Sequence, residues 1–352
     1  MKSLTRLALA ASAVLLGVSL GAVTAVGAPS EPTIDNPGGI EAVTSPAGVP
    51  ANGYGPDLHL FLSAKARSGM QPGLNPLGAN DFNCVPQADQ NPVVLVPGTA
   101  EDAYAAWAYF SPRLKQAGYC VFTFNYNPST HKDIHGNVVT DDDKAFSGDI
   151  KQTAAFMAGF VDRVLAATGA QKVDLVGHSQ GGGVLPRSYI KWYGGDKKVD
   201  KLIGLVPNNH GTTMGGMNEL FNKLLVKWPG IKTDVLDATN QQGLLEQLVN
   251  SELLTSLNEG GMTYPDIKYT VISTKLDTVV TPYTNAFIEE PGVKNLTLQD
   301  VCPADAHLHQ NIPYSDVALQ LTLRALNADN LSWQMPVECY RYQAYLKASD
   351  LI

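Results

Sequence analysis

The sequence predicts an α/β fold in which helices cover both faces of a mainly parallel sheet. Six short apolar runs, each bounded by turn residues, are typical of strands that are buried on both faces. Helical patterns separate most of these runs, and such alternation implies crossover connections between parallel strands. The clearest helical pattern runs from Ile150 to Leu165, with Ser147 as a candidate N-cap and Gly169 as the stop.

The predicted strands lie, in chain order, within PVVLVPG (92–98), CVFTFNYNP (120–128), KVDLVG (172–177), KLIGLVPN (201–208), IKYTVIST (267–274) and VKNLTLQD (293–300). After the third strand we expect a helix from Gln180 to Tyr193, ended by two glycines. Pro186 lies inside this stretch and is expected to kink the helix, because proline cannot donate a backbone hydrogen bond.

Two segments interrupt the alternation. Residues 131–144 are polar and contain a Gly-Asn turn signal, so we expect a surface excursion. Residues 212–264 form a helical insertion with two apolar patterns, Leu220 to Trp228 and Leu244 to Leu257. Insertions at the carboxyl side of such a sheet lie over the ligand crevice. Helices packed on the core and a mobile lid both remain open for this segment.

The N-terminal residues are typical of an export signal. Lys2 and Arg6 precede an uncharged run that ends in small residues, which predicts a signal peptide over 1–28 and a secreted protein. A retained membrane anchor is the alternative reading of this run. Residues 29–83 are interpreted as a linker or N-terminal strap, because they begin rich in proline and glycine.

Composition limits the partners. The chain has 352 residues, 44% of them hydrophobic, and a formal net charge of -8. This is enough apolar material for a sizeable core, and the acidic balance argues against nucleic acid as a partner. We therefore expect a neutral substrate and a monomer. In an oxidising compartment the four cysteines predict disulfides, and Cys84 with Cys120 and Cys302 with Cys339 are favoured because each closes a moderate loop.

A candidate nucleophile lies in the segment VDLVGHSQGGG. Gly177 to Gly181 match Gly-x-Ser-x-Gly, a sharp turn from strand to helix that exposes the serine hydroxyl at the edge of a sheet. The predicted strand and helix on either side supply the required context. A glycine-rich phosphate cradle is the rival reading, but its lysine and glycine spacing are absent from the sequence here. Ser179 is therefore the expected nucleophile.

A serine hydroxyl needs a base, and the base needs an acid that holds its tautomer. In this type of sheet the order along the chain is serine, acid, histidine. Asp277 directly follows a predicted strand and is the expected acid, with Asp300 as the second choice. Downstream the base must be His307 or His309, and His309 is preferred because a helix follows at a loop's length.

The remaining histidines have weaker assignments. His178 adjoins the nucleophile, but its side chain must point elsewhere, and His210 either lines the site or bonds a carbonyl. His131 and His135 share the polar excursion with acidic residues, where a surface cation site is a minor hypothesis. No cofactor and no resident metal are expected.

A negatively charged tetrahedral intermediate requires hydrogen-bond donors. The backbone N-H of Gln180, directly after the nucleophile, is one expected donor. The second should come from the loop after the first strand, where Thr99 offers a backbone N-H and a hydroxyl. Thr99 and Gln180 therefore form the predicted oxyanion hole.

Together, VVLVPGTA, VDLVGHSQGG, PNNHGTT, STKLDTVVTP and the histidine before NIPYSDVAL resemble the secreted bacterial lipases of the class 2 type, within the α/β-hydrolase superfamily. The resemblance covers about residues 84–330, the expected catalytic domain, and leaves 331–352 as a tail tied by a disulfide. It implies hydrolysis of carboxylic esters, commonly acylglycerols, with transient contact to a lipid interface. It also implies that Ser179, Asp277 and His309 are the catalytic residues, with Thr99 and Gln180 as oxyanion donors.

Two alternatives remain from the sequence. The same residues would serve an acyltransferase or a cutinase-like polyester hydrolase, in which only the acceptor or the substrate differs. A non-catalytic binding module on a hydrolase scaffold is a more remote reading, because fold alone does not establish activity.

Overall fold

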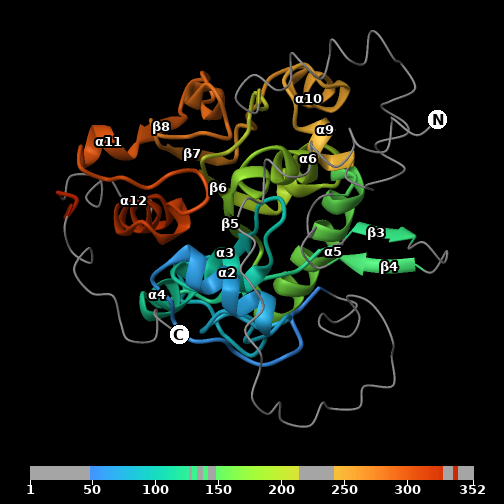
Figure 1. Ribbon diagram of the computed structural model, residues 1–352, viewed down its shortest axis with the longest axis vertical. Helices are drawn as coiled ribbons and strands as arrows, with labels where there is room; N and C mark the ends of the chain where they lie inside the picture. The colour runs from blue at the N-terminus through green and yellow to red at the C-terminus, as the bar shows by residue number, and fades with distance from the viewer. Residues whose placement is uncertain are drawn as a thin grey trace, which may run out of the picture. The chain divides into compact units, whose positions relative to one another are not determined.

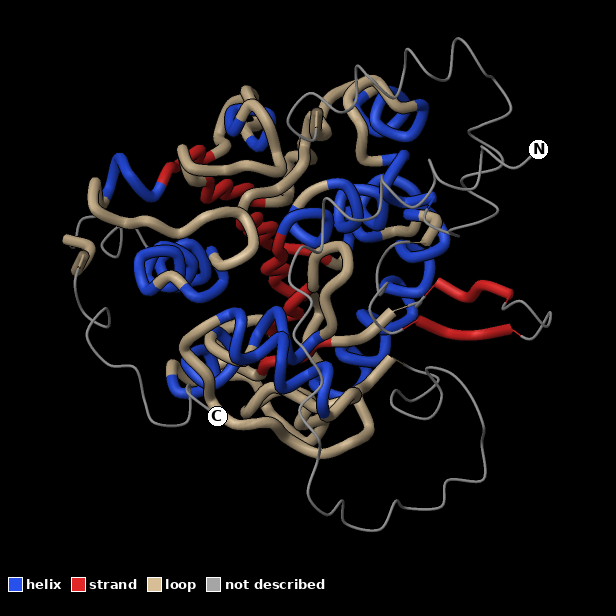
Figure 2. The backbone as a smooth tube through the Cα atoms, viewed as in Figure 1, coloured by secondary structure: helices blue, strands red, loops and turns tan. Residues whose placement is uncertain are grey.

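The computed structural model describes residues 48–126, 129–132, 138–141, 148–213, 242–327 and 336–339. All of them belong to one compact unit that runs from Asn36 to Ile352. Its centre is a six-stranded sheet in the order β2-β1-β5-β6-β7-β8, and every neighbouring pair is parallel (Figures 1 and 2). The predicted α/β class is therefore confirmed.

Each predicted apolar run overlaps one strand of this sheet, although β5 ends one residue after its run and β6 begins two residues before its run. The strands are β1 (Val93–Val96), β2 (Val121–Thr123), β5 (Val173–His178), β6 (Val199–Leu205), β7 (Lys268–Ser273) and β8 (Lys294–Thr297). Because all strands run in one direction, their carboxyl ends meet at one edge of the sheet, where ligands bind in open α/β sheets.

Helices cover both faces of the sheet. On one face lie α3 (Ala103–Trp107), α4 (Phe110–Gln116) and α12 (Asp316–Asn327), and on the other α5 (Ile150–Thr168) and α6 (Val184–Trp192). Strand β1 shows the division, because Val93 and Leu95 pack in the first core and Val94 and Val96 in the second. Figure 1 shows α12 on one side of the central strands and α5 on the other.

The start of α5 corrects one detail of the sequence reading. The N-cap is Asp149, whose side chain accepts a hydrogen bond from Gln152 N at 2.8 Å, and not Ser147. At the other end Gly169 adopts the left-handed conformation with φ 68°, as the predicted stop requires.

The described half of the 212–264 insertion packs on the core. It forms α9 (Gln242–Glu246) and α10 (Glu252–Asn258), whereas the first expected pattern, Leu220 to Trp228, lies outside the described residues. Leucines of α10 pack against Val184 of α6. Lys191 Nζ also donates to the carbonyls of Ser256, Leu257 and Glu259 at 2.9, 3.1 and 2.6 Å, so a cation of α6 holds the carboxyl end of α10.

The segment interpreted as a strap contains a helix, α2 (Phe61–Met70), which packs on α3. Lys65 Nζ of α2 donates to the carbonyl of Ala100 at 2.9 Å, and Ser68 bonds the Asp102 side chain that caps α3. This part of the strap therefore supports the loop that follows β1.

Both expected disulfides are present. Cys84 is bonded to Cys120 and Cys302 to Cys339, with Cα atoms 5.7 and 5.5 Å apart. The second bond attaches the described tail residues 336–339 to the end of α11 (Leu298–Val301). The backbone of Glu338 also exchanges two hydrogen bonds with the side chain of Gln320 on α12. The described residues 336–339 are thus tied to the core.

Shorter elements complete the described chain: β3 (Ser129–Lys132), β4 (Val138–Asp141), and the 3-10 helices η3 (Ser179–Gly182), η4 (Gly195–Lys197), η6 (Tyr283–Ala286) and η7 (Ile312–Tyr314). β3 and β4 form an antiparallel pair that overlaps the predicted polar excursion of residues 131–144, with β3 beginning two residues before it.

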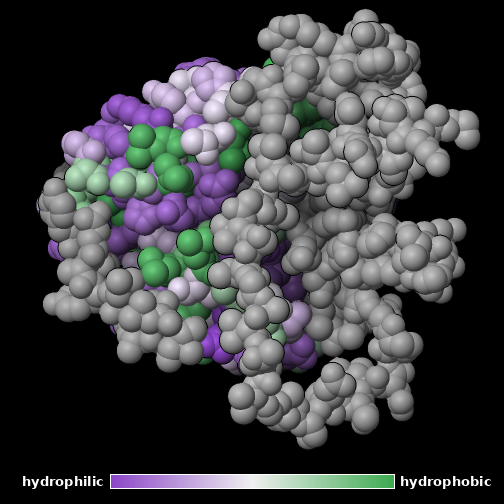
Figure 3. Space-filling view, viewed as in Figure 1, coloured by the Kyte–Doolittle hydropathy of each residue, from purple (hydrophilic) through white to green (hydrophobic). Residues whose placement is uncertain are grey.

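On the face drawn in Figure 3, hydrophobic residues of the described part form small patches separated by hydrophilic residues. Within the described residues no helix has the length and apolar composition to cross a bilayer. The predicted signal peptide lies outside the described part of the chain.

Candidate active site

The predicted nucleophile lies in a strained turn at the carboxyl edge of the sheet. β5 ends at His178, and Ser179 follows with φ 54°, a conformation that non-glycine residues rarely adopt. A Cβ atom on Gly177 would lie 1.7 Å from the Gly181 carbonyl oxygen, and one on Gly181 would lie 2.3 Å from the Val96 carbonyl oxygen. Both glycines of the motif are therefore required by close backbone approach.

The helix after this turn differs from the expected one. Residues 179–182 form the short helix η3, and α6 begins only at Val184, so the helical stretch is divided at Gly183. Pro186 consequently occupies the first turn of α6, where a missing N-H costs little, instead of kinking a longer helix.

The structure brings three of the predicted residues together from separate loops. His309 Nε2 lies 2.9 Å from Ser179 Oγ, and His309 Nδ1 lies 2.9 Å from Asp277 Oδ2. Asp277 follows β7, and His309 lies on the loop before η7. All three are buried, with exposed fractions of 7% for Ser179, 8% for Asp277 and 4% for His309.

The second carboxylate oxygen of Asp277 fixes this orientation. Oδ1 accepts the backbone N-H groups of Val279 at 2.8 Å and Val280 at 2.9 Å, which leaves Oδ2 for the imidazole. Because Nδ1 faces a carboxylate, it carries the proton, and the lone pair of Nε2 is directed at the serine hydroxyl. This arrangement can remove the proton from Ser179.

The second-choice acid, Asp300, and the other candidate base, His307, bond residues other than Ser179. The Asp300 side chain is exposed on α11 and bonds Lys275 and Thr297, and the first of these bonds is the main reason why its pKa is lowered. His307 is also turned to another partner, since its Nδ1 lies 2.8 Å from Asp305 Oδ1. Of the two candidate bases, His309 is the one that contacts Ser179.

The two oxyanion candidates contact each other. Thr99 Oγ1 donates to Gln180 Oε1 at 2.9 Å, and Gln180 is fully buried. The hydroxyl proton of Thr99 is therefore engaged, and it would have to rotate away from Gln180 to reach an oxyanion. Gln180 Nε2 is a buried donor without a hydrogen-bond partner in the described structure.

The sequence reasoning missed Gln247, which joins this pair from the insertion. Its Nε2 lies 2.7 Å from Gln180 Oε1 and 3.1 Å from Thr99 Oγ1, and its Oε1 accepts from Asn208 Nδ2 at 2.8 Å. A sequence signal existed, because Gln247 is a polar residue among the apolar positions from Leu244 to Leu257. The insertion is thereby hydrogen-bonded to the loop after β1.

Glu101 is a second missed residue. It is 5% exposed, and its Oε2 accepts the backbone N-H of Gly98 at 3.1 Å and lies 2.8 Å from His178 Nδ1. The only signal in the sequence was an acidic residue three positions after the Pro-Gly turn. The partner of His178 is thus a carboxylate from the loop that carries Thr99.

The remaining candidate histidines are His210, His131 and His135. Much of His210 is exposed, but partial burial of the side chain and then the charge of Arg187 lower its pKa, against a hydrogen bond with the backbone of Phe287. His131 lies in β3, where only the backbone is described, and His135 is outside the described residues. The described part of the chain contains no cluster of three or more histidine, cysteine or acidic side chains that would hold a metal ion.

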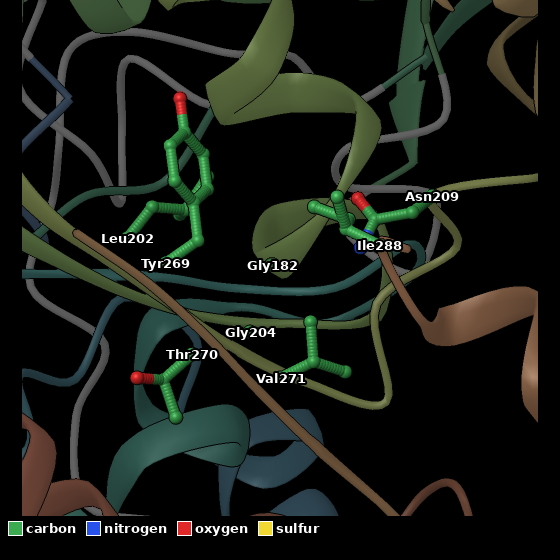
Figure 4. Close-up of a pocket in the computed structure, with 8 residues that line it drawn as sticks. All are labelled: Gly182, Leu202, Gly204, Asn209, Tyr269, Thr270, Val271 and Ile288. Carbon is green, nitrogen blue, oxygen red and sulfur yellow. The ribbon is translucent and has the colours of Figure 1, made fainter. Parts of the chain in front are cut away.

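A small cavity lies beneath the nucleophile turn. The cavity has a volume of about 10 Å³. Its lining includes Gly182 of η3, Gly204 of β6 and Asn209 (Figure 4). Asn209 Oδ1 is buried without a hydrogen-bond partner in the described structure. Such a space suits one water molecule and is too small for an ester.

Comparisons with known proteins agree with this geometry. Residues 90–322 match the family model described as Lipase (class 2). No match was found among curated proteins. Among solved structures, Aspergillus fumigatus lipase B superposes with a TM-score of 0.53 at 22% identity, over 76% of this chain and 58% of that chain. A mature Bacillus licheniformis lipase is 17% identical over 68% of this chain and 94% of its own, with a TM-score of 0.47.

The Aspergillus comparison shows a shared fold, although this chain spans less than two thirds of that protein. The family match carries more weight, because it extends over most of the chain and includes the nucleophile turn and the loops of Asp277 and His309. The chain therefore belongs to the class 2 lipase family and has the α/β-hydrolase fold.

Proposed function

We propose that this protein is a secreted, monomeric lipase or esterase that cleaves acylglycerol-type esters through an acyl-enzyme on Ser179. The observation that carries the proposal is the continuous chain of contacts from Asp277 through His309 to Ser179 Oγ, each 2.9 Å long. Histidine-activated serines of this kind attack acyl carbonyls.

In the proposed first step, Ser179 Oγ attacks the ester carbonyl carbon while His309 Nε2 takes the hydroxyl proton. Asp277 stabilises the resulting imidazolium and holds its orientation. The protonated His309 then gives its proton to the leaving alcohol. A water molecule then attacks the acyl carbonyl while His309 Nε2 takes one of its protons. His309 returns this proton to Ser179 Oγ as the carboxylic acid is released.

The oxyanion of each tetrahedral intermediate needs donors near Ser179. The backbone N-H groups of Thr99 and Gln180 are the proposed donors, and each such donor typically lowers the barrier by about 2.7 to 4 kcal/mol. The Thr99 hydroxyl can assist only after it leaves Gln180 Oε1, to which it donates at 2.9 Å. The Gln247 side chain would have to move with the Thr99 hydroxyl, since it contacts both Thr99 and Gln180.

Secretion is supported by two independent features. The first 28 residues match the pattern of an export signal. Two disulfides are formed, which persist in oxidising compartments. Expression of the full chain followed by N-terminal sequencing of the exported protein tests this part, and retention of residues 1–28 would contradict it.

The catalytic proposal is tested with a fluorophosphonate probe and a series of p-nitrophenyl esters from acetyl to palmitoyl. We expect the wild-type protein to be labelled once and Ser179→Ala to lose labelling and at least about 10⁴-fold in kcat. Triacylglycerol emulsions, compared with soluble esters, identify the preferred substrate. Labelling that survives in Ser179→Ala would refute the assignment of the nucleophile.

A further inference from the structure

A second acid-histidine pair lies directly behind the proposed catalytic residues. His178 is the last residue of β5 and is 2% exposed. Its Nδ1 lies 2.8 Å from Glu101 Oε2, and its Nε2 lies 2.8 Å from the backbone carbonyl oxygen of His309. The rings of His178 and His309 have their centroids 5.2 Å apart. One buried side chain therefore contacts both the loop of Thr99 and the loop of the base.

The protons of this pair can be assigned from its partners. A carbonyl oxygen only accepts, so His178 Nε2 carries a proton. Glu101 Oε2 also accepts the N-H of Gly98 at 3.1 Å, which favours its ionised form and places a second proton on His178 Nδ1. The pair is then an imidazolium bonded to a carboxylate.

The titration behaviour agrees with this assignment. Burial disfavours both charges, yet Glu101 and its hydrogen bond raise the pKa of His178 above its ordinary value. The charge of His178 and the same hydrogen bond lower the pKa of Glu101 below its ordinary value, again against the effect of burial. Each group is thus charged because the other is charged.

The surrounding backbone leaves the pair little freedom. A Cβ atom on Gly98 would lie 2.9 Å from His178 Nδ1 and 3.0 Å from Glu101 Oε2, so the loop backbone packs closely against both. Ala100, in the same loop, is held by Lys65 at 2.9 Å. Movement of the pair would therefore displace the segment that carries Thr99.

We propose that His178 and Glu101 form a positioning pair that holds the loop of His309 and the loop of Thr99 in register with Ser179. The inference rests on the proposed function. Neither side chain contacts Ser179 Oγ in the hydrogen bonds described, and both act through neighbours: His178 through the His309 carbonyl, Glu101 through the Gly98 N-H. Ester hydrolysis then depends on a buried ion pair that takes no part in proton transfer.

The two contacts of His178 can be separated by substitution. The amide of His178→Asn reaches roughly the position of Nδ1 and keeps a partner for Glu101, whereas His178→Gln reaches roughly that of Nε2 and keeps a donor for the His309 carbonyl. We expect His178→Asn to lose about 10- to 100-fold in kcat with KM changed less than about twofold, because small misplacements of a catalytic group have effects of this size. His178→Gln should lose less than His178→Asn.

Glu101→Gln keeps the shape of the acid and removes its charge, and we expect a kcat loss between those of the two His178 variants. The rate of fluorophosphonate labelling should fall in parallel with kcat, because it reports the reactivity of Ser179. Glu290→Gln is the matched control, since Glu290 also accepts backbone N-H groups in a loop, those of Met262 and Thr263. If His178→Asn does not fold, Glu101→Gln carries the same test.

The outcomes distinguish this inference from the proposed function. Hydrolysis that survives in Ser179→Ala would refute the proposed function. If Ser179→Ala is inactive while His178→Asn and Glu101→Gln keep wild-type kcat and labelling rates, only the positioning pair is refuted. It is also refuted if both variants lose activity only in proportion to unfolded protein, as measured by thermal melting beside Glu290→Gln.

Discussion

Strand β5 has a buried charged cluster at each end, and the two clusters differ in where their contacts lead. Near its start, Asp174 accepts from Lys201 Nζ at 2.9 Å, and Lys201 also donates to Asp200 at 2.8 Å. These charges are satisfied by one another and by Asn91, whose Nδ2 donates to both carboxylates. At the other end, His178 and Glu101 also form a pair, but their contacts continue to His309 and so to Ser179.

The difference shows that buried charge alone does not mark a functional site. Burial raises the pKa of Asp174 despite its partner Lys201, so this cluster has a perturbed titration as well. What distinguishes the carboxyl end is a chain of hydrogen bonds that terminates on a hydroxyl at the edge where ligands bind. We therefore expect changes at the start of β5 to alter stability and changes at its end to alter activity.

The largest expected effect is at the carboxyl edge of the sheet, where the hydrogen-bond chain from β5 reaches Ser179 and His309. Asp277→Asn should lower kcat about 10⁴-fold, because an amide no longer holds the Nδ1-H tautomer of His309. The free energy of unfolding should change little by comparison. Steady-state hydrolysis of a p-nitrophenyl ester and urea unfolding measure both quantities.

His307→Ala serves as the control for this variant, since His307 pairs with Asp305 and should retain activity. Loss of activity in His307→Ala together with a fully active His309→Ala would contradict the assignment of the base.

The largest stability effect should come from the start of β5. Lys201→Met leaves Asp174, which is 1% exposed, without its cation, and such losses cost about 3 to 5 kcal/mol in the free energy of unfolding. The kcat of the folded protein should stay within about twofold of wild type.

The double variant Lys201→Met/Asp174→Leu should recover much of the lost stability, because no unpaired charge remains on either residue. If Lys201→Met instead lowers kcat strongly without changing the free energy of unfolding, the expected difference between the two ends of β5 is wrong.

A smaller effect on activity is expected at the insertion. Gln247→Ala removes the amide that contacts Thr99 and Gln180, and we expect kcat/KM to fall about tenfold, equivalent to about 1.4 kcal/mol. Gln242→Ala, at the start of the helix that ends just before Gln247, is the matched control, because Gln242 bonds Asp149 and Glu246 instead. Equal losses in both variants would point to a general disturbance of α9.

The smallest effect is the pH dependence of stability that the His178-Glu101 pair contributes. The pKa of His178 is raised above 6.5, so its contribution is fully present below pH 6.5 and is lost as pH rises through the raised pKa. The pKa of Glu101 is lowered below 4.5, so its contribution is present above pH 4.5 and is lost as pH falls through the lowered pKa. Asp277 and Lys65 act on the pair in the same directions.

The stability difference between wild type and Glu101→Gln should therefore be largest near pH 6 and shrink toward alkaline pH. Urea unfolding of both proteins at about pH 6 and about pH 9 measures it. A difference that stays the same between these two pH values would show that His178 is neutral in the folded protein.

Local signals in the sequence were sufficient for much of the fold. Each of the six apolar runs overlaps a strand, and Gly169 ends α5, because strand burial and a left-handed helix stop depend on a few adjacent residues. The position at which α5 begins depends on distant residues as well. Ser147 and Asp149 are both good caps, but Glu246 of the insertion accepts the Ile150 N-H and Gln242 bonds Asp149, which favours the later start.

The candidate active site also has features that the local sequence predicts and features that depend on tertiary contacts. The sequence by itself determined the strained serine turn, because glycines two residues on either side are needed for the backbone to close within that pentapeptide. Only the tertiary structure decided between His307 and His309 and revealed Glu101 and Gln247 as partners. These contacts join residues 32 to 148 positions apart, and a hydrogen bond across such separations depends on how the loops meet in space.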